Sequence, residues 1–83
     1  MKKPFIEVCR DGHKIAIVRT FKTCSLYIDG TDVDVYHGVV EIPYVLKGNV
    51  EQDVITAREE MTFCCGVIKL FYNDELIAKK FHL

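Results

Sequence analysis

The residues of this chain with the widest chemical range are its cysteines and histidines. Thiolate and imidazole are the usual protein ligands of zinc. The spacing argues against such a site, because there is no Cys-x-x-Cys knuckle and adjacent residues of a strand point to opposite faces. Cys64 and Cys65 can share one ion only across a bulge or turn, which Gly66 permits. The full set is Cys9, Cys24, Cys64, Cys65, His13, His37 and His82.

We therefore expect buried, reduced cysteines and no cofactor. The alternative is a small metal- or ligand-binding protein centred on Cys64 and Cys65, with Cys9 and His13 as the remaining candidate ligands.

No catalytic constellation is visible. A nucleophilic thiol needs a base within hydrogen-bond reach and a third group that orients the base, and His13 and Cys9 flank one turn without pairing directly. An EF-hand calcium-binding loop requires acidic residues at alternate positions followed by a glycine. Here, Gly30 precedes Asp32 and Asp34. No phosphate-cradling glycine motif occurs. We predict no catalytic residue and no enzymatic activity.

Two tyrosines indicate the one interaction surface that we predict from the sequence. If Asp29-Gly30 is a hairpin turn, Tyr27 and Tyr36 lie on the outer face of that hairpin, with Asp32 and Asp34 around them. Exposed tyrosines rimmed by polar groups are typical of contact surfaces. The predicted interaction surface comprises Tyr27, Tyr36, Asp32 and Asp34.

Two Asp-Gly pairs between β-prone runs predict the elements that hold these residues. Two-residue type I′ turns favour Asp-Gly because both positions need positive φ. A turn at Asp11-Gly12 pairs Arg10 with His13, Val8 with Ile15 and Ile6 with Ile17. A turn at Asp29-Gly30 pairs Leu26 with Val33 and points Cys24 inward, opposite Val35.

A third hairpin turns at Asn73-Asp74. A two-residue loop pairs Leu70 with Ile77, whereas a loop that extends through Glu75 shifts this register by one residue.

Before this third hairpin, residues 39–46 read as a strand that Lys47-Gly48-Asn49 closes with a turn. Pro43 cannot donate to a ladder, so it predicts an edge strand.

Residues 50–61 fit two structures. The β-branched run Val54-Ile55-Thr56 favours a strand, which we prefer. As a helix, the segment would start at Asn49 and carry an apolar stripe. That stripe would comprise Val50, Val54, Ala57 and Met61.

These elements predict an all-β fold: a small antiparallel β-sandwich or partly open barrel of about seven or eight short strands. The 83 residues are expected to form one domain, residues 1–83. The alternative is an α+β fold with one helix around residues 50–61. Too few positions match between the Asp-Gly hairpins to predict an internal repeat.

Net charge and hydropathy indicate which partners and which cellular compartment to expect. With a net charge of −1, the protein has no overall positive electrostatic potential that would attract nucleic acid or an anionic membrane. No apolar run is long enough for a signal peptide or membrane span, so we expect a cytoplasmic protein. Residues 1–28 carry six Lys/Arg against two acids, and residues 29–60 carry two against eight. A self-complementary contact is one consequence of this asymmetry.

The predicted function is therefore a non-catalytic protein-interaction or self-association module. Its expected partner is another protein or a second copy in a homodimer, with neither nucleic acid nor membrane involved. An exposed sheet face or edge strand would supply the contact.

Overall fold

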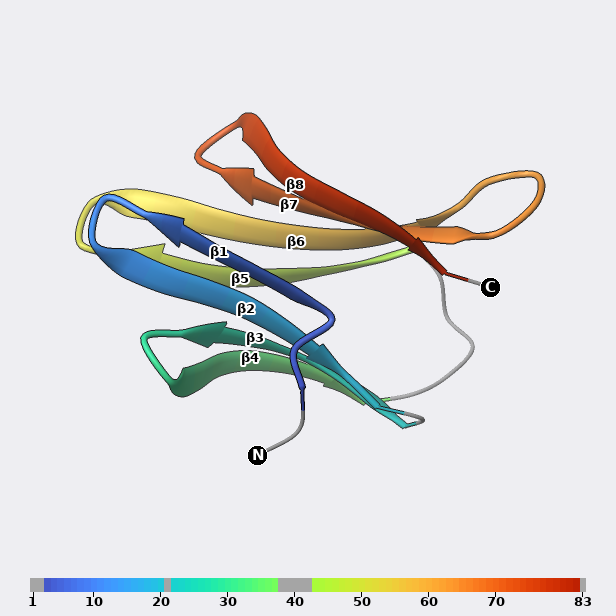
Figure 1. The fold of residues 1–83 in the computed structure, drawn as a ribbon, viewed down its shortest axis with the longest axis horizontal. Coiled ribbons are helices and arrows are strands. Elements are labelled where there is room, and N and C mark those ends of the chain that lie inside the picture. The colour runs from blue at the N-terminus through green and yellow to red at the C-terminus, as the bar shows by residue number, and fades with distance from the viewer. Residues whose placement is uncertain (1–2, 21, 38–42, 83) are drawn as a thin grey trace.

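In a computed structural model, which describes residues 3–20, 22–37 and 43–82, the chain forms eight antiparallel strands and these residues contain no helix. Two four-stranded sheets, β1-β2-β3-β4 and β5-β6-β7-β8, make a sandwich rather than a closed barrel (Figure 1). The predicted all-β class is confirmed. The strands are β1 (Ile6–Arg10), β2 (His13–Arg19), β3 (Thr23–Ile28), β4 (Thr31–His37), β5 (Tyr44–Val50), β6 (Asp53–Met61), β7 (Gly66–Tyr72) and β8 (Glu75–His82).

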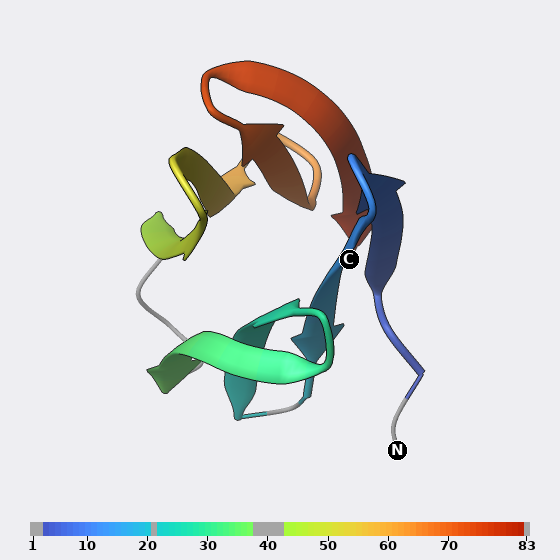
Figure 2. The same ribbon diagram turned by 90° about the vertical axis from the view of Figure 1, so that its left-hand side faces the viewer.

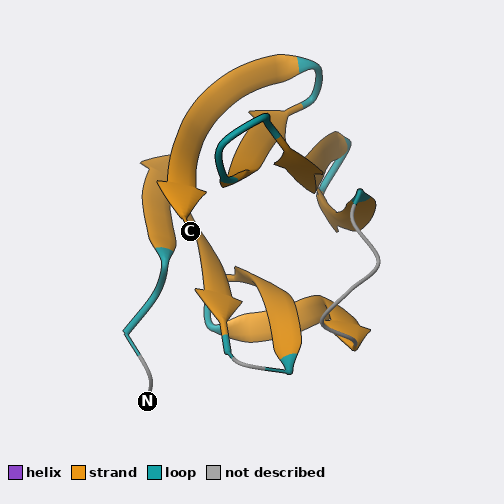
Figure 3. Ribbon diagram, turned by 90° about the vertical axis from the view of Figure 1, so that its right-hand side faces the viewer, coloured by secondary structure: helices purple, strands orange, loops and turns teal. Residues whose placement is uncertain are grey.

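The two sheets form separate layers. Figures 2 and 3 view the molecule from its two ends and show each layer curving around a shared interior, with β1 beside β8 at one side. Within each sheet, every strand pairs only with its neighbours in the chain. No helix capable of spanning a membrane occurs in the described residues.

The first two hairpins turn where the Asp-Gly pairs predict. Asp11 and Asp29 have φ of 51° and 52°, and Gly12 and Gly30 have φ of 79° and 86°. Positive φ at both central positions is the requirement of a type I′ turn. The predicted β1–β2 register is confirmed in all three pairs.

The β3–β4 register changes part of the way along the hairpin. Tyr27 faces Asp32 as predicted, but a bulge follows, so that Leu26 faces Asp34 and Cys24 faces Tyr36. The predicted pairs of Leu26 and Cys24 are therefore wrong. Val33 is the extra residue, and an extra residue moves each later side chain of its strand to the other face.

The β7–β8 hairpin has the same irregularity. Tyr72 faces Glu75 across the two-residue turn, and a bulge then brings Leu70 opposite Ala78. The predicted turn at Asn73-Asp74 is correct, but Leu70 does not face Ile77. The pairing of Leu70 is shifted by one residue, as in the alternative register, although a bulge and not a loop through Glu75 causes the shift.

Residues 50–61 form strand and turn, as preferred, and not the alternative helix. The turn lies at Glu51 and Gln52, where Glu51 has φ of 56°. The predicted turn at 47–49 is wrong, because these residues continue β5 to Val50. β5 is an edge strand, as Pro43 predicts. The earlier part of the predicted strand, residues 39–42, lies outside the described residues.

The contacts of Gly48 explain why a glycine stands in a strand and not in the predicted turn. A Cβ atom there would lie 2.6 Å from Cγ2 of Val33 and 3.0 Å from Cδ1 of Ile28 in the opposite sheet. Gly48 therefore serves close approach of the two sheets and not a turn.

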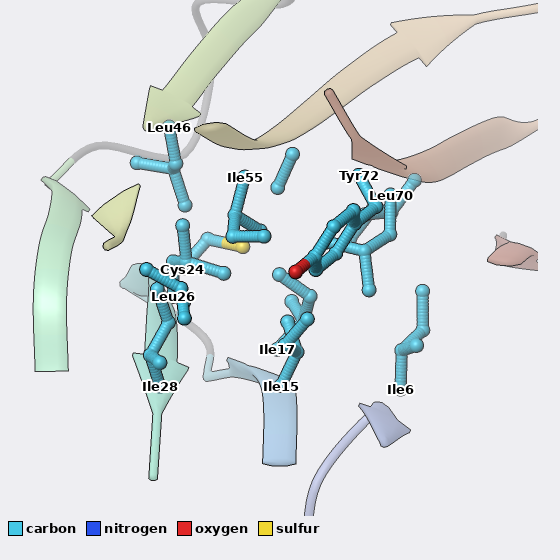
Figure 4. Close-up of a cluster of buried hydrophobic side chains, with 13 residues drawn as sticks. Ile6, Ile15, Ile17, Cys24, Leu26, Ile28, Leu46, Ile55, Leu70 and Tyr72 are labelled. Atoms are coloured by element: carbon cyan, nitrogen blue, oxygen red, sulfur yellow. The ribbon is translucent and has the colours of Figure 1, made fainter. Parts of the chain in front are cut away.

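Buried aliphatic side chains fill the space between the layers (Figure 4). Each side chain of this size contributes about 1.5–3 kcal/mol when fully buried. Cys24 lies among them at 3% exposure, which confirms its predicted inward orientation. The largest fully buried apolar side chains are Ile15, Ile17, Leu26, Leu46, Ile55, Ile68 and Leu70.

The two sheets are also two copies of one structural plan. Asp29 and Asn73 occupy equivalent turn positions. The Asp29 amide donates to the carbonyl of Lys14 at 2.8 Å, and the Asn73 amide donates to that of Val54 at 2.7 Å. Each turn side chain accepts the return bond, from Lys14 N at 2.9 Å and from Val54 N at 3.0 Å. With the matching bulges, these bonds reveal an internal repeat of structure that the residue identities do not show.

The repeat extends to the connections between the middle strands. Thr20 donates its amide to Thr23 O at 2.8 Å, and Thr62 donates its amide to Cys65 O at 2.8 Å. The second connection stands farther out, since β6 has nine residues and β2 has seven. In Figure 1 it is the orange loop that projects beyond the sandwich.

Candidate functional sites

The structure divides the predicted tyrosine surface between two faces. Tyr27 stays on the outer side with Asp32 opposite. The bulge turns Tyr36 toward the core, where its ring stacks on Tyr44 with centroids 4.0 Å apart. Asp34 accepts a hydrogen bond from the backbone amide of Lys47 at 2.9 Å and so ties β4 to β5. The four predicted residues do not form one continuous surface.

Tyr27 does border a hollow on the outer face of its own sheet. The hollow has a volume of about 110 Å³ and is mainly apolar. Pro4, Ala16 and Val18 contribute much of its wall. It is large enough for one apolar side chain, and nothing in it points to a reaction.

A buried carboxylate lies between the two sheets. Glu59 is 1% exposed and follows Ile55 and Ala57 on the inner face of β6. It accepts hydrogen bonds from the Tyr44 hydroxyl and from Nη2 of Arg19 at 3.3 Å. Nε2 of His82 lies 2.6 Å from the same carboxylate. We call Glu59, Arg19, Tyr44 and His82 the Glu59 cluster.

The cluster keeps Glu59 charged in spite of its burial. Burial acts to raise the pKa of Glu59, but the hydrogen bond from Tyr44, the positive charge of Arg19 and the contact with His82 outweigh it, so the pKa lies below its ordinary 4.5. Burial, with hydrogen bonds to Cys24 and Glu59, raises the pKa of Tyr44 and keeps its hydroxyl protonated. Burial likewise raises the pKa of Cys24.

This arrangement suits structure better than catalysis. Glu59 is already engaged by three side chains, and the neighbouring phenol and thiol are held in their protonated forms. Arg19 comes from the first sheet and Glu59 from the second, so their contact bridges the layers. Sequence reasoning missed the cluster, although the alternation Ile55-Ala57-Glu59 places the carboxylate inside once β6 is recognised as a strand.

Cys64 and Cys65 lie together in the projecting connection between β6 and β7. Their Sγ atoms are 3.4 Å apart, because the connection is a turn and adjacent side chains need not diverge there. Cys64 is exposed and Cys65 half-buried, so the expectation of buried cysteines is wrong at these two positions. The hydroxyl of Thr62 lies 3.6 Å from the first sulfur and 3.7 Å from the second. We call Thr62, Cys64 and Cys65 the thiol loop.

The thiol loop lowers the pKa of Cys64 below its ordinary 9.0. Hydrogen bonding to the Thr62 hydroxyl contributes most, followed by hydrogen bonding to the Cys65 thiol. A thiol with a lowered pKa presents more of the nucleophilic thiolate near neutral pH.

The other two proposed metal ligands lie elsewhere. Cys9 faces Lys14 on β1 and β2, and Nδ1 of His13 contacts Asp29 at 2.7 Å beside the β1–β2 turn. Figure 1 shows that turn at the opposite end of the molecule from the orange loop. Among the described residues, no three His, Cys, Asp or Glu side chains are grouped to hold a metal ion.

The end that bears the hairpin turns is polar and acidic. Arg10 pairs with Glu75 at 2.9 Å and lies 4.9 Å from the centre of the Tyr72 ring. The Tyr72 hydroxyl donates to Asp53 at 2.8 Å, and this bond with burial raises the pKa of Tyr72 to about 12. These side chains border an open hollow of about 620 Å³.

The outer face of β5–β8 combines cations with exposed apolar groups. The strand register places Arg58, Lys69 and Lys79 in one row across β6, β7 and β8. Glu60 is the one acidic side chain that the alternation of these strands places outward, and it pairs with Arg58 at 2.8 Å and Lys69 at 2.9 Å. We call this surface the cationic face. It comprises Val45, Lys47, Val54, Arg58, Glu60, Lys69, Phe71, Leu76, Lys79 and Phe81.

The aromatic rings of the cationic face are partly covered by its own cations. The Arg58 guanidinium lies 5.0 Å from the centre of the Phe71 ring, and Nζ of Lys79 lies 5.7 Å from that of Phe81. Four of the seven large apolar side chains that are most exposed in the described residues lie here. These four are Val45, Val54, Leu76 and Phe81.

Comparison of the chain with models of protein families, with curated proteins and with solved structures finds no match.

Proposed function

We propose that this protein is a non-catalytic interaction module that binds an acidic protein surface through the cationic face. One observation carries the proposal: four cations and one carboxylate share a sheet face with four exposed apolar side chains. Apolar contact supplies affinity, and charge complementarity selects the partner and speeds association.

The apolar composition favours a protein partner over a nucleic acid. The face exposes aliphatic side chains, which an apolar protein surface can bury and polar phosphate groups cannot. These side chains are Val45, Val54 and Leu76. Single-stranded nucleic acid is usually held by bases that stack on open aromatic rings. On this face, Arg58 already lies over Phe71.

The size of the face predicts a weak complex. The area of the face is about 400 Å², because its four strands lie about 4.8 Å apart and each is about seven residues long, with a rise of about 3.3 Å per residue. A stable complex buries about 800 Å² on each partner. We therefore expect a transient contact that salt weakens.

A binding measurement with defined probes tests the proposal. Fluorescence anisotropy of a labelled peptide of alternating glutamate and leucine is expected to report binding that weakens about tenfold in the double variant Lys47→Glu, Lys79→Glu. Both lysines are exposed, and neither takes part in the Glu60 ion pairs. Lys22→Glu, an exposed change in the β2–β3 connection, is the matched control and should change binding less than about twofold.

Equal weakening by Lys22→Glu, or tighter binding of an oligothymidylate strand than of the peptide, would overturn the proposal. Native mass spectrometry of the purified protein separately reports whether a second copy is the partner. Dimers that persist in the Lys47→Glu, Lys79→Glu variant would place the contact on another surface.

The alternative metal-binding function has less support. Two sulfurs lie within reach of one ion, but Cys9 and His13 lie next to the β1–β2 turn, which Figure 1 shows at the far end of the molecule. Structural zinc takes four ligands.

A further inference from the structure

We infer that Cys64 and Cys65 form a thiol–disulfide exchange site whose substrate is an organic disulfide and whose oxidised form is a disulfide within the thiol loop. This inference is independent of the proposed function, since it rests on a loop that does not belong to the cationic face.

Proximity is the first argument. The sulfurs are 3.4 Å apart, so small side-chain rotations bring them to bonding distance. The two positions also differ in access, since Cys64 is exposed and Cys65 half-buried. An exposed attacking thiol with a resolving thiol beside it is the arrangement that exchange requires.

The comparison of the two connections is the second argument. In the β2–β3 connection, the amides of Lys22 and Thr23 approach the hydroxyl of Thr20 at 3.3 Å and 3.0 Å. In the thiol loop, the amides of Cys64 and Cys65 approach the hydroxyl of Thr62 at 3.4 Å and 3.1 Å.

The same pattern of hydrogen bonds therefore forms with lysine and threonine in place of the two cysteines. The thiols are not needed to build this turn. Their presence on the longer, projecting hairpin needs another explanation, and exchange chemistry provides one.

The reaction balances without a metal. The Cys64 thiolate attacks one sulfur of the organic disulfide, whose S–S bond breaks and releases one thiolate. The Cys65 thiol loses its proton to solvent and attacks Sγ of Cys64, which expels the second thiolate. Two electrons pass from the protein to the organic disulfide, and the protons that Cys64 and Cys65 gave up to solvent are taken up by the two released thiolates.

The loop disulfide should be easy to reduce. Adjacent Cα atoms are about 3.8 Å apart across a trans peptide, which is less than the separation of about 4.4 Å at which unstrained disulfides begin. Strained disulfides have higher reduction potentials and are the labile ones. The site is therefore expected to cycle and not to lock the loop permanently.

Oxidised glutathione is the probe for the test. A Cys9→Ser variant is incubated with it, quenched with an alkylating reagent and weighed by mass spectrometry. We expect two thiols to disappear with no glutathione retained. Cys65→Ser in the same background removes the resolving thiol and is expected to retain one glutathione on Cys64.

The matched control is Cys64→Lys with Cys65→Thr, which carries the residues of the β2–β3 connection and is expected to keep the fold by circular dichroism. In the otherwise unmodified protein, we expect Cys64 to react about tenfold faster than Cys9. Reaction of Cys9 at an equal rate, glutathione retained on the intact pair, or no loss of thiols would each overturn the inference.

Discussion

The carboxylate of Glu59 and the imidazole of His82 meet 2.6 Å apart between the two sheets because Gly66 leaves room for the ring. A Cβ atom on Gly66 would lie 2.5 Å from Nε2 of His82. The same ring forms a T-shaped contact with Phe5, with the centroids 6.0 Å apart. A glycine of β7 thus allows a residue of β8 to reach a buried charge on β6.

Glu59→Gln tests the contribution of this charge to stability. We expect a loss of about 2 kcal/mol, because the amide forms neutral hydrogen bonds where the carboxylate forms charge-assisted ones. Urea unfolding followed by circular dichroism measures it. Glu60→Gln, on the outer face of the same strand, should cost less than about 1 kcal/mol. Equal losses would show that Glu59 has no special role.

The dependence of the free energy of unfolding on pH is a second test of the Glu59 cluster. We call its fall at low pH the acid limb. The folded-state pKa of Glu59 lies below its ordinary 4.5, so the stabilisation is fully present above pH 4.5 and is lost as pH falls through the folded value. Asp29, Asp53 and Glu60 also have lowered pKa values and add to the acid limb. Glu59→Gln should therefore flatten this limb only in part. An unchanged slope would contradict the prediction.

Gly48→Ala probes the approach of the two sheets. The new methyl group meets Cγ2 of Val33 at 2.6 Å, and we expect a loss of about 1–3 kcal/mol. Adding Val33→Ala removes the clashing carbon and should restore part of the loss, which a double-mutant cycle measures. Asn49→Ala, at an exposed position of the same strand, is the control and should stay within about 0.5 kcal/mol.

His13 and Asp29 form a pair that titrates. The hydrogen bond to Asp29 raises the pKa of His13 above 6.5, with smaller contributions from nearby carboxylates. The stabilisation from this pair is present below pH 6.5 and is lost as pH rises through the folded value. Asp29→Asn should lower the pKa of His13, as measured by NMR titration of its imidazole protons. Asp32→Asn, an exposed change in the same hairpin, should have a much smaller effect.

The sequence predicts turns better than it predicts the strands' irregularities. Asp11-Gly12 and Asp29-Gly30 have a local physical cause in their positive φ. The extra residues Val33 and Ile77 have no such local signal, because their bulges depend on what the following side chains pack against. For this reason, the prediction that Tyr27 and Tyr36 share the outer face of the hairpin is wrong.

Other errors come from contacts between the sheets. Gly48 resembles a turn residue until Val33 is placed against it. The burial of Glu59 depends on Arg19, Tyr44 and His82, which are distant in sequence. The meeting of Cys64 with Cys65 required a turn, which Gly66 permitted but did not specify.

The meander of each sheet also bears on how the chain folds. Every ladder joins neighbouring strands, so each sheet can pair its strands by closing short loops, at small cost in chain entropy. The apolar face of each sheet stays exposed to water until the other sheet packs against it. The ion pair of Arg19 with Glu59 spans 40 positions of the chain, and it forms only when the two halves dock. Docking is therefore expected to be the step that makes folding cooperative.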